Sequence, residues 1–441
     1  MKRFLLFLGD IAVLYLSLIL VLWLRYGSDF YGELLERHLT PFTALFPLWL
    51  LTFYVTGLYD LRELRNNLEF LRILGTAILV NTVLSVAFFY LLPISEIAPK
   101  TNLLLFIAVF ILLEMIWRRS FNRLAKDWQP LRMAIIGQGE TVTELRTFIS
   151  QNPQLGYEIA LDFPDERSLP SFEDRETWRR TIREHKLELI VVPGNFFRKE
   201  KFTKNFFRLL NLGIEVRDFP SFYEGVFRRI PLSDIDEEWF LKYVGNRRLV
   251  YSHAKRFLEF TLALFILALF LPLWLLIGLL TKLSSSGPAI YRQVRMGQFG
   301  RRFTLYKFRT MREDAEKDGP QWAAVKDDRS TWVGQVLRFT HLDELPQLWN
   351  IIKGQLSFVG PRPERPEFVE ILRKEVPYYE TRLLVKPGLT GWAQIHHRKD
   401  ATVEDVTRKI QFDLYYLKNR SMILDLAILL KTLRLFVSNP K

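Results

Sequence analysis

Two adjacent carboxylates followed by a rigid basic turn form the part of this sequence best suited to chemistry. Asp343 and Glu344 stand where a helical apolar pattern begins, and the turn Pro361-Arg362-Pro363 follows that pattern. A carboxylate can attack phosphorus to form a reactive acyl-phosphate. Mg²⁺, bound by carboxylate and phosphate oxygens, would offset the repulsion between these acids and a phosphate. The stretch is suited to handling a metal-bound phosphate, with Asp343 and Glu344 as candidate catalytic residues and candidate metal ligands.

Helix capping is the simpler local explanation for the acid pair. Acidic residues in the first turn of a helix are favoured by the helix dipole, and Pro346 is tolerated there. Adjacent helical side chains point about 100° apart. The two carboxylates are therefore not expected to act as a matched pair on one ligand. One would face the reaction centre while the other supports a metal ion or a proton transfer.

A basic and aromatic stretch precedes the acid pair. In the run from Phe303 to Met311, Lys307 and Arg309 alternate with apolar residues, which predicts a strand with both cations on one face. Such a face suits contact with phosphate. Attraction to anionic lipid headgroups, about 1 kcal/mol per basic residue, is the alternative explanation.

The element that must carry this region is an uncharged apolar block from Phe260 to Leu280. Pro272 in its middle removes a backbone donor and predicts a break or kink. Basic residues flank both ends, and no acidic residue lies between positions 282 and 312. A helix that crossed the membrane would place one basic cluster outside. We therefore predict a re-entrant hairpin over 257–281, with its break at Pro272, that enters and leaves through one leaflet.

Four more apolar blocks fill the first quarter of the chain, each near the roughly 20 residues needed to cross a bilayer. They are Phe4–Leu24, Pro41–Leu58, Ile73–Leu92 and Leu103–Trp117. The Lys and Arg residues that orient them gather before the first block, between the second and third, and after the fourth. These are Lys2, Arg3, Arg62, Arg65, Arg72, Arg118, Arg119, Arg123 and Lys126. Both ends of this bundle are predicted to be cytoplasmic.

Composition agrees with a membrane protein that carries soluble parts. Hydrophobic residues make up 49% of the 441 residues, and the formal net charge is +13. Basic clusters beside apolar blocks favour an anionic membrane surface over nucleic acid as the partner. The absence of cysteine excludes disulfides, thiolate catalysis and cysteine-ligated zinc.

A soluble α/β region follows the bundle. Buried strands are predicted at 132–137, 187–192 and 212–216, with a helix at 141–150, which together indicate a small doubly wound parallel sheet. Gly137-Gln-Gly139 after the first strand resembles a phosphate-binding turn, but Val142 replaces the third glycine of that motif. A structural or regulatory domain is favoured over a dinucleotide site.

Three ordered segments resemble the bacterial sugar transferases, which are polyprenyl-phosphate hexose-1-phosphate transferases or monotopic phosphoglycosyl transferases. They read KLSSSGPAIYRQVRMGQFGRRFTLYKFRTM, LDELPQLWNIIKGQLSFVGPRP and KPGLTGWAQI. The resemblance runs from Tyr251 to the C-terminus, and the preceding regions resemble those of the large members. It implies a four-helix transmembrane bundle (1–125), a Rossmann-like α/β domain (131–245) and an α/β catalytic domain (251–441) with a re-entrant membrane helix.

The resemblance implies transfer of a hexose-1-phosphate from a UDP-sugar, UDP-glucose or UDP-galactose, to undecaprenyl phosphate with release of UMP. The reaction would pass through a covalent aspartyl phospho-sugar with Mg²⁺ as cofactor, and would initiate exopolysaccharide, capsule or O-antigen synthesis. The implied location is the bacterial inner membrane, with the catalytic domain on the cytoplasmic face. A homo-oligomer is left open, and nucleic acid is not an expected partner.

The resemblance also assigns roles to single positions. It makes Asp343 the nucleophile, Glu344 its partner, Lys307, Arg338 and Arg362 cations around the substrate phosphates, Asp413 a further site acid and Pro272 the hairpin break. The sequence departs from the family at His341, where a small hydroxyl residue is usual. It departs again at His396-His397-Arg398, where Asn-Gly-Arg often stands, and there surface residues are favoured over a metal site.

Two other functions are weighed against the transferase. Tyr251-Ser-His-Ala-Lys255 matches the Tyr-x-x-x-Lys pattern of short-chain dehydrogenases. Together with the Gly137–Gly139 turn, it motivates a membrane-anchored NAD-dependent nucleotide-sugar dehydratase or epimerase. The third reading is a non-enzymatic scaffold of polysaccharide assembly. The apolar C-terminal helix at 421–437 is expected either on the membrane or in the catalytic core.

Overall fold

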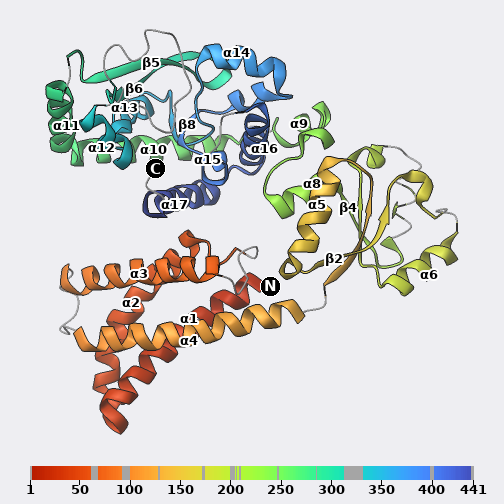
Figure 1. The fold of residues 1–441 in the computed structure, drawn as a ribbon, viewed down its shortest axis with the longest axis horizontal. Coiled ribbons are helices and arrows are strands. Elements are labelled where there is room, and N and C mark those ends of the chain that lie inside the picture. The colour runs from red at the N-terminus through yellow and green to blue at the C-terminus, as the bar shows by residue number, and fades with distance from the viewer. Residues whose placement is uncertain are drawn as a thin grey trace. The chain divides into compact units, whose positions relative to one another are not determined.

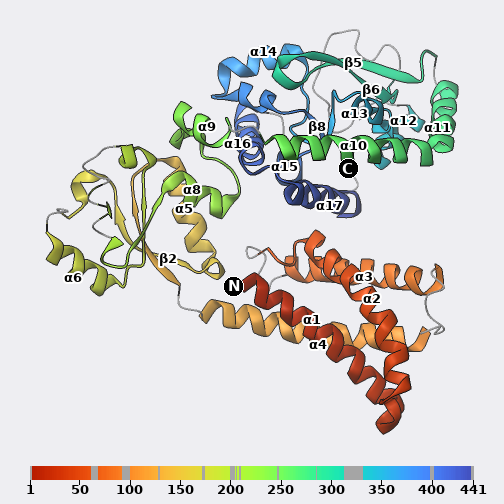
Figure 2. The ribbon, with the colours of Figure 1, turned by 180° about the vertical axis from the view of Figure 1, so that it is seen from behind.

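A computed structural model describes most of the chain and divides it into two compact units, Met1–Asp218 and Phe219–Lys441 (Figures 1 and 2). The described residues are 2–60, 68–91, 100–127, 130–170, 174–198, 204, 206–207, 210–245, 248–284, 286–311, 331–397 and 402–438. Arg62, Arg65 and Arg398, which were used in the sequence interpretation, lie outside them.

The first unit begins with four helices long and apolar enough to cross a membrane, which confirms the helical N-terminal region. They are α1 (Lys2–Tyr26), α2 (Glu33–Thr56), α3 (Leu68–Leu91) and α4 (Lys100–Asp127). Aromatic rings pack edge to face or stacked along α2 and α4, with Trp49 between Phe106 and Phe110. The described helices α2 and α4 begin before the predicted apolar blocks, because helices continue into more polar flanking residues.

A four-stranded parallel sheet completes the first unit, in the order β2-β1-β3-β4. Its strands are β1 (Leu131–Ile136), β2 (Tyr157–Phe163), β3 (Leu189–Val192) and β4 (Glu215–Asp218). Helices α5 (Glu140–Gln151) and α6 (Arg175–His185) lie on opposite sides of it (Figure 1). The parallel α/β prediction is confirmed. β2 was missed because its residues are only half-buried and show little apolar contrast.

The turn after β1 is held by α5. Arg146 donates a hydrogen bond to the Gly137 carbonyl at 2.9 Å and forms an ion pair with Asp162 near the end of β2. Gly137 and Gly139 have φ values of 122° and 133°, which a side chain would strain. These contacts give the glycine turn a structural role in joining strand and helix.

In the second unit, helices and short strands pack around a large apolar core, and a smaller apolar cluster joins α11, α12 and β6 (Figure 1). Its helices and strands are α8 (Phe219–Phe227), α9 (Glu237–Tyr243), α10 (Leu249–Leu269), α11 (Leu271–Ser284), β5 (Ile290–Met296), β6 (Arg302–Phe308), α12 (Trp332–Thr340), α13 (Gln347–Ile352), β7 (Ser357–Val359), α14 (Pro366–Glu375), β8 (Gly388–Thr390), α15 (Trp392–His396), α16 (Val403–Asn419) and α17 (Met422–Ser438). β5 and β6 pair antiparallel, whereas β7 and β8 pair in parallel.

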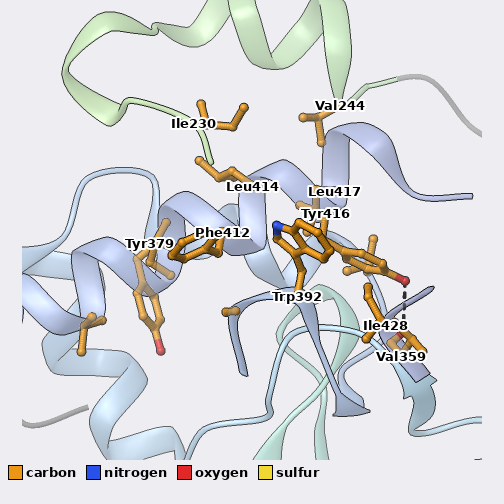
Figure 3. Close-up of a cluster of buried hydrophobic side chains, with 14 of the residues drawn as sticks. Ile230, Val244, Val359, Tyr379, Trp392, Phe412, Leu414, Tyr416, Leu417 and Ile428 are labelled. Carbon is orange, nitrogen blue, oxygen red and sulfur yellow. Dashed lines mark hydrogen bonds between the residues drawn. The ribbon is translucent and has the colours of Figure 1, made fainter. Parts of the chain in front are cut away.

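The core of this unit gathers side chains from both ends of its sequence. Figure 3 shows Ile230 and Val244 facing α16 near Leu414 and Leu417, and Trp392 next to Tyr416 of the same helix. The Ile230 N–H donates to the Gln411 carbonyl, and the Trp392 indole donates to the Arg228 carbonyl. Residues 219–245, which the sequence grouped with the α/β domain, therefore pack with the C-terminal unit.

Helices α10 and α11 meet at an angle of 65°, and α10 ends at Leu269. Pro272 is the second residue of α11, where its missing N–H costs no helical hydrogen bond. A break next to Pro272 is thus present, displaced toward the N-terminus. The pair is tied to the rest of the unit by Arg256, which donates to the Ile351 and Ile352 carbonyls at the end of α13.

Candidate active site

Asp343 and Glu344 lie in one turn of 3-10 helix, η8 (Leu342–Glu344), between α12 and α13. Pro346 lacks the N–H that would bond to Leu342 in a continuous α-helix, and the Leu345 N–H bonds to that carbonyl instead. The regular helix therefore begins at Gln347, later than the sequence predicted.

The Asp343 carboxylate is buried but is not bonded to the described side chains around it. The residue is 8% exposed, and its carboxylate forms no hydrogen bond or ion pair with any other residue that the structure describes. Burial raises the pKa of Asp343, and the charges of Lys307 and Arg338 offset this only in part. An aspartate of raised basicity with uncommitted lone pairs is suited to attack an electrophile.

Glu344 has the opposite environment. Its carboxylate lies 2.8 Å from the Lys307 ammonium and 3.5 Å from the Arg362 guanidinium. Burial would raise the pKa of Glu344, but these two cations outweigh it and hold the pKa at about 2. The adjacent acids are therefore unequal, since Glu344 is fixed as an anion between cations while Asp343 remains available.

The β5–β6 hairpin presents Lys307 to this turn. Lys307 stands near the end of β6, opposite Tyr291 of β5. Arg309 follows the strand, is 7% exposed, and donates its backbone N–H to Ala289. Across the described residues, no hydrogen bond or ion pair joins Arg309 to Asp343 or Glu344. The structure thus brings Lys307, but not Arg309, into contact with the acid pair.

Close packing of α12 places Arg338 near Asp343. Gly334 lies so near Thr310, two residues after β6, that an added Cβ would be 2.0 Å from the Thr310 carbonyl oxygen. Arg338 follows in the last turn of α12, where its charge lowers the pKa of Asp343. A glycine is therefore required for α12 to bring this cation to the site.

Arg362 projects from the turn after β7. Gly360 bonds to Thr390 of β8, and a Cβ at Gly360 would lie 2.4 Å from the Lys386 carbonyl oxygen. The turn is thus seated against the β8 strand. Arg362 remains 42% exposed and reaches toward Glu344. Its accessible guanidinium beside a buried carboxylate makes a site suited to a phosphate group.

Comparison with known proteins identifies the family. The model of the family described as "Bacterial sugar transferase" matches residues 250–439, which include the whole acid pair and its cations. A Caulobacter vibrioides protein named UDP-glucose:undecaprenyl-phosphate glucose-1-phosphate transferase is 41% identical over 189 residues, 42% of this chain and 70% of that protein. The chain belongs to the bacterial sugar transferase family.

The names of other relatives carry either N-acetylgalactosamine or glucose. An Aeromonas hydrophila UDP-N-acetylgalactosamine-undecaprenyl-phosphate N-acetylgalactosaminephosphotransferase is 43% identical over 42% of this chain and 44% of its own length. A Xanthomonas campestris pv. campestris UDP-glucose:undecaprenyl-phosphate glucose-1-phosphate transferase is 29% identical over 68% of this chain and 65% of its own length. The chain thus covers less than half of the Aeromonas relative.

Asp413 does not join the acid pair. It is almost fully buried in α16 and forms an ion pair with Arg382 at 3.0 Å. Arg382 in turn donates to the Arg362 carbonyl at 3.0 Å. Asp413 therefore reaches the site through Arg382, a residue that sequence reasoning missed because no local motif marks it.

His396 and His397, which depart from the family pattern, are half-buried. His396 stacks between Trp392 and Phe412, and the His397 ring lies 3.3 Å from Asp405. No group of three or more metal-ligating His, Asp or Glu side chains occurs in the described part of the chain. The histidines are thus less exposed than expected, because both rings contact residues of α16.

The Tyr251 and Lys255 pair has a structural use. The Tyr251 hydroxyl donates to Asp425 at 2.7 Å, and the Lys255 ammonium bonds to Asp425 and to the Val359 carbonyl. Tyr416 completes the group with a hydrogen bond to Val359 (Figure 3). These contacts join α10 and α17 to β7, so the apolar C-terminal helix is attached to the core by its first turn.

The carboxylates of the site would bind Mg²⁺ only if a substrate supplied further oxygen ligands. Mg²⁺ is commonly bound by one or two carboxylates together with substrate phosphates. Asp343 has uncommitted oxygens, whereas Glu344 already contacts two cations. Asp343, with Glu344 beside it, would therefore bind the ion together with oxygens of a substrate phosphate.

Proposed function

We propose that this protein transfers a sugar-1-phosphate from a UDP-sugar to undecaprenyl phosphate and releases UMP. The observation that carries the proposal is a buried, uncommitted Asp343 carboxylate beside Lys307, Arg338 and Arg362. Relatives named for this reaction with glucose or N-acetylgalactosamine support it. UDP-glucose and UDP-galactose are the donors expected first, and UDP-N-acetylgalactosamine belongs in the same test.

The reaction has two balanced steps. An Asp343 oxygen attacks the sugar-bearing phosphorus of the donor, an Asp–O–P bond forms, and the bridging P–O bond breaks with its electron pair leaving on UMP. A phosphate oxygen of the lipid acceptor then attacks the same phosphorus and displaces the Asp343 carboxylate. The product is an undecaprenyl-pyrophosphate sugar. Lys307 and Arg362 hold the charged oxygens, and Glu344 orients both cations.

Mg²⁺ would screen the pyrophosphate charge when it is bound at this site. The residue-level prediction is that Asp343 and Glu344 contribute its protein oxygens. Arg309, which follows β6 and is 7% exposed, stays a proposed phosphate contact that would need the substrate to reach below the exposed surface.

The membrane arrangement is part of the proposal. Helices α1 to α4 would span the bacterial inner membrane with both ends of the bundle in the cytoplasm. The α10–α11 pair would enter and leave through the cytoplasmic leaflet, which brings a soluble donor and a lipid acceptor to one surface. Because the chain has no cysteine, Lys282→Cys supplies a unique label. Reaction of that cysteine only with an external reagent would contradict the same-side arrangement.

The chemical test uses two assays with the full chain. UMP release is measured for the three UDP-sugars with undecaprenyl phosphate and Mg²⁺, and one donor is expected to give lipid-dependent turnover. Labelled UMP is then added with that donor alone. A covalent intermediate predicts exchange of label into the UDP-sugar without the lipid. Turnover without exchange would contradict the two-step path, and absence of UMP release would contradict the function.

A further inference from the structure

A buried ionic cluster lies beneath the turn that carries Arg362, and the proposed chemistry does not use it. The cluster consists of Arg295 in β5, Glu364 after the turn, Arg382 before β8, and Lys409 and Asp413 in α16. The Lys409 ammonium lies 2.8 Å from Glu364, and Arg382 lies 3.0 Å from Asp413. Buried charges require partners, so these five side chains define one another's positions.

The turn cannot hold its own shape with main-chain hydrogen bonds. Pro361 and Pro363 have no N–H, so the three-residue turn has one main-chain donor and three carbonyl acceptors. Each carbonyl is satisfied from outside. Pro361 accepts from the Gly388 N–H at 2.9 Å, Arg362 accepts from Arg382 at 3.0 Å, and Pro363 accepts from Arg295 at 3.3 Å.

The guanidinium of Arg382 performs two tasks at once. One nitrogen, Nη2, meets both the Asp413 carboxylate and the Arg362 carbonyl, while Nη1 donates to the Tyr379 hydroxyl. Its side chain is 3% exposed. A planar guanidinium with several fixed donors can satisfy these acceptors together, whereas an ammonium of lysine is a single compact charge on a flexible stem.

We propose that Arg382 is a positioning residue that aims Arg362 at the acid pair, and that Asp413 and Glu364 fix Arg382 in place. This inference rests on the proposed transferase function. Arg382 touches the main chain of Arg362, and the Arg362 guanidinium reaches Glu344. A shift of this turn by about 1 Å would misplace the phosphate-facing cation, and such a misplacement costs on the order of 10²-fold in rate.

The test is a double-mutant cycle on the full chain. Arg382→Lys, Arg362→Met and the double variant are compared with the wild type by kcat and KM for UMP release. Arg302→Lys is the matched control, because Arg302 forms an exposed ion pair with Glu370 in the same unit. Thermal unfolding of each variant reports folding. If Arg382→Lys does not fold, Glu364→Gln enters the cycle in its place.

Arg382→Lys is expected to lower kcat by about 10- to 100-fold in the wild-type background. In the Arg362→Met background the same change is expected to lower kcat by less than about threefold, because the cation it aims is absent. Equal losses in both backgrounds, or wild-type activity in Arg382→Lys, would overturn the inference while leaving the transferase intact. A wild type that releases no UMP overturns the proposed function and this inference together.

Discussion

Two of the described groups that combine two carboxylates with an arginine differ in how their carboxylates are paired. In the bundle, Arg118 of α4 forms ion pairs with Asp10 of α1 and with Glu114, and all three side chains are fully buried. In the C-terminal unit, Glu344 is paired with Lys307 and Arg362, while Asp343 has no bond to a described residue. In the bundle both carboxylates contact the arginine that they share, which holds helices together, whereas the Asp343 carboxylate has no such contact with a described residue and is suited to a substrate.

The bundle group is more fully bonded than its charges alone suggest. Arg118 also donates to the Leu58 carbonyl at 2.8 Å, and the Trp117 indole donates to Asp10 at 3.0 Å. Ionisable side chains inside a membrane bundle are costly unless they are paired in this way. This group therefore fastens α1 and α4, and its contribution should be seen in stability rather than in turnover.

The largest expected effect comes from removing the Asp343 carboxylate, which has no ion pair with a described residue. Asp343→Asn should lower the rate of UMP release by at least about 10⁴-fold, because loss of a covalent nucleophile removes the reaction path. The midpoint temperature of thermal unfolding should be unchanged or slightly raised, since the substitution replaces a buried carboxylate with a neutral amide. Glu370→Gln, at an exposed carboxylate, is the control and should retain activity. Appreciable turnover by Asp343→Asn would contradict the nucleophile assignment. The acid pair would then be structural, like the group around Arg118.

The complementary change is in the bundle. Arg118→Leu leaves Asp10 and Glu114 buried without their cation, and breaking such a group costs about 3–5 kcal/mol. Thermal unfolding in detergent should show a large loss of stability, while kcat per folded molecule stays near that of the wild type. A fall in kcat without loss of stability would contradict the structural assignment.

A smaller effect, and one visible in the pH profile, is expected at Lys307. Lys307→Met should lower kcat by about 10²-fold, since one cation facing the phosphates is lost. Lys307 also lowers the pKa of Asp343, so its removal raises that pKa. Because Asp343 must be ionised to attack, the acid limb of the rate profile should move to higher pH. If the acid side of the pH–rate profile does not move, the ionisation of Asp343 does not control it.

Sequence reasoning predicted those parts of the molecule that local pattern determines. The long apolar helices, β1, β3 and the break beside Pro272 follow from hydropathy and proline geometry. The contact between Lys307 and Glu344 was within reach because both residues stand in recognisable segments.

Long-range ion pairs were beyond that reasoning. Arg382 and Asp413 lie 31 positions apart and carry no motif of their own, so only the fold brings them together beneath Arg362. His396 was misjudged for a related reason. Its exposure depends on α16, whose packing against α15 no local pattern indicates.

The smallest effect is expected at an ion pair that neither buries its charges nor faces the site. Arg302 lies 3.8 Å from Glu370, and both side chains are more than half exposed. Such pairs contribute about 0–1 kcal/mol and are screened by salt. Arg302→Met should therefore change the midpoint temperature of thermal unfolding little and leave kcat unchanged. Any difference in that midpoint from the wild type should vanish at high salt. A loss as large as that of Arg118→Leu would mean that burial does not separate structural ion pairs from incidental ones in this chain.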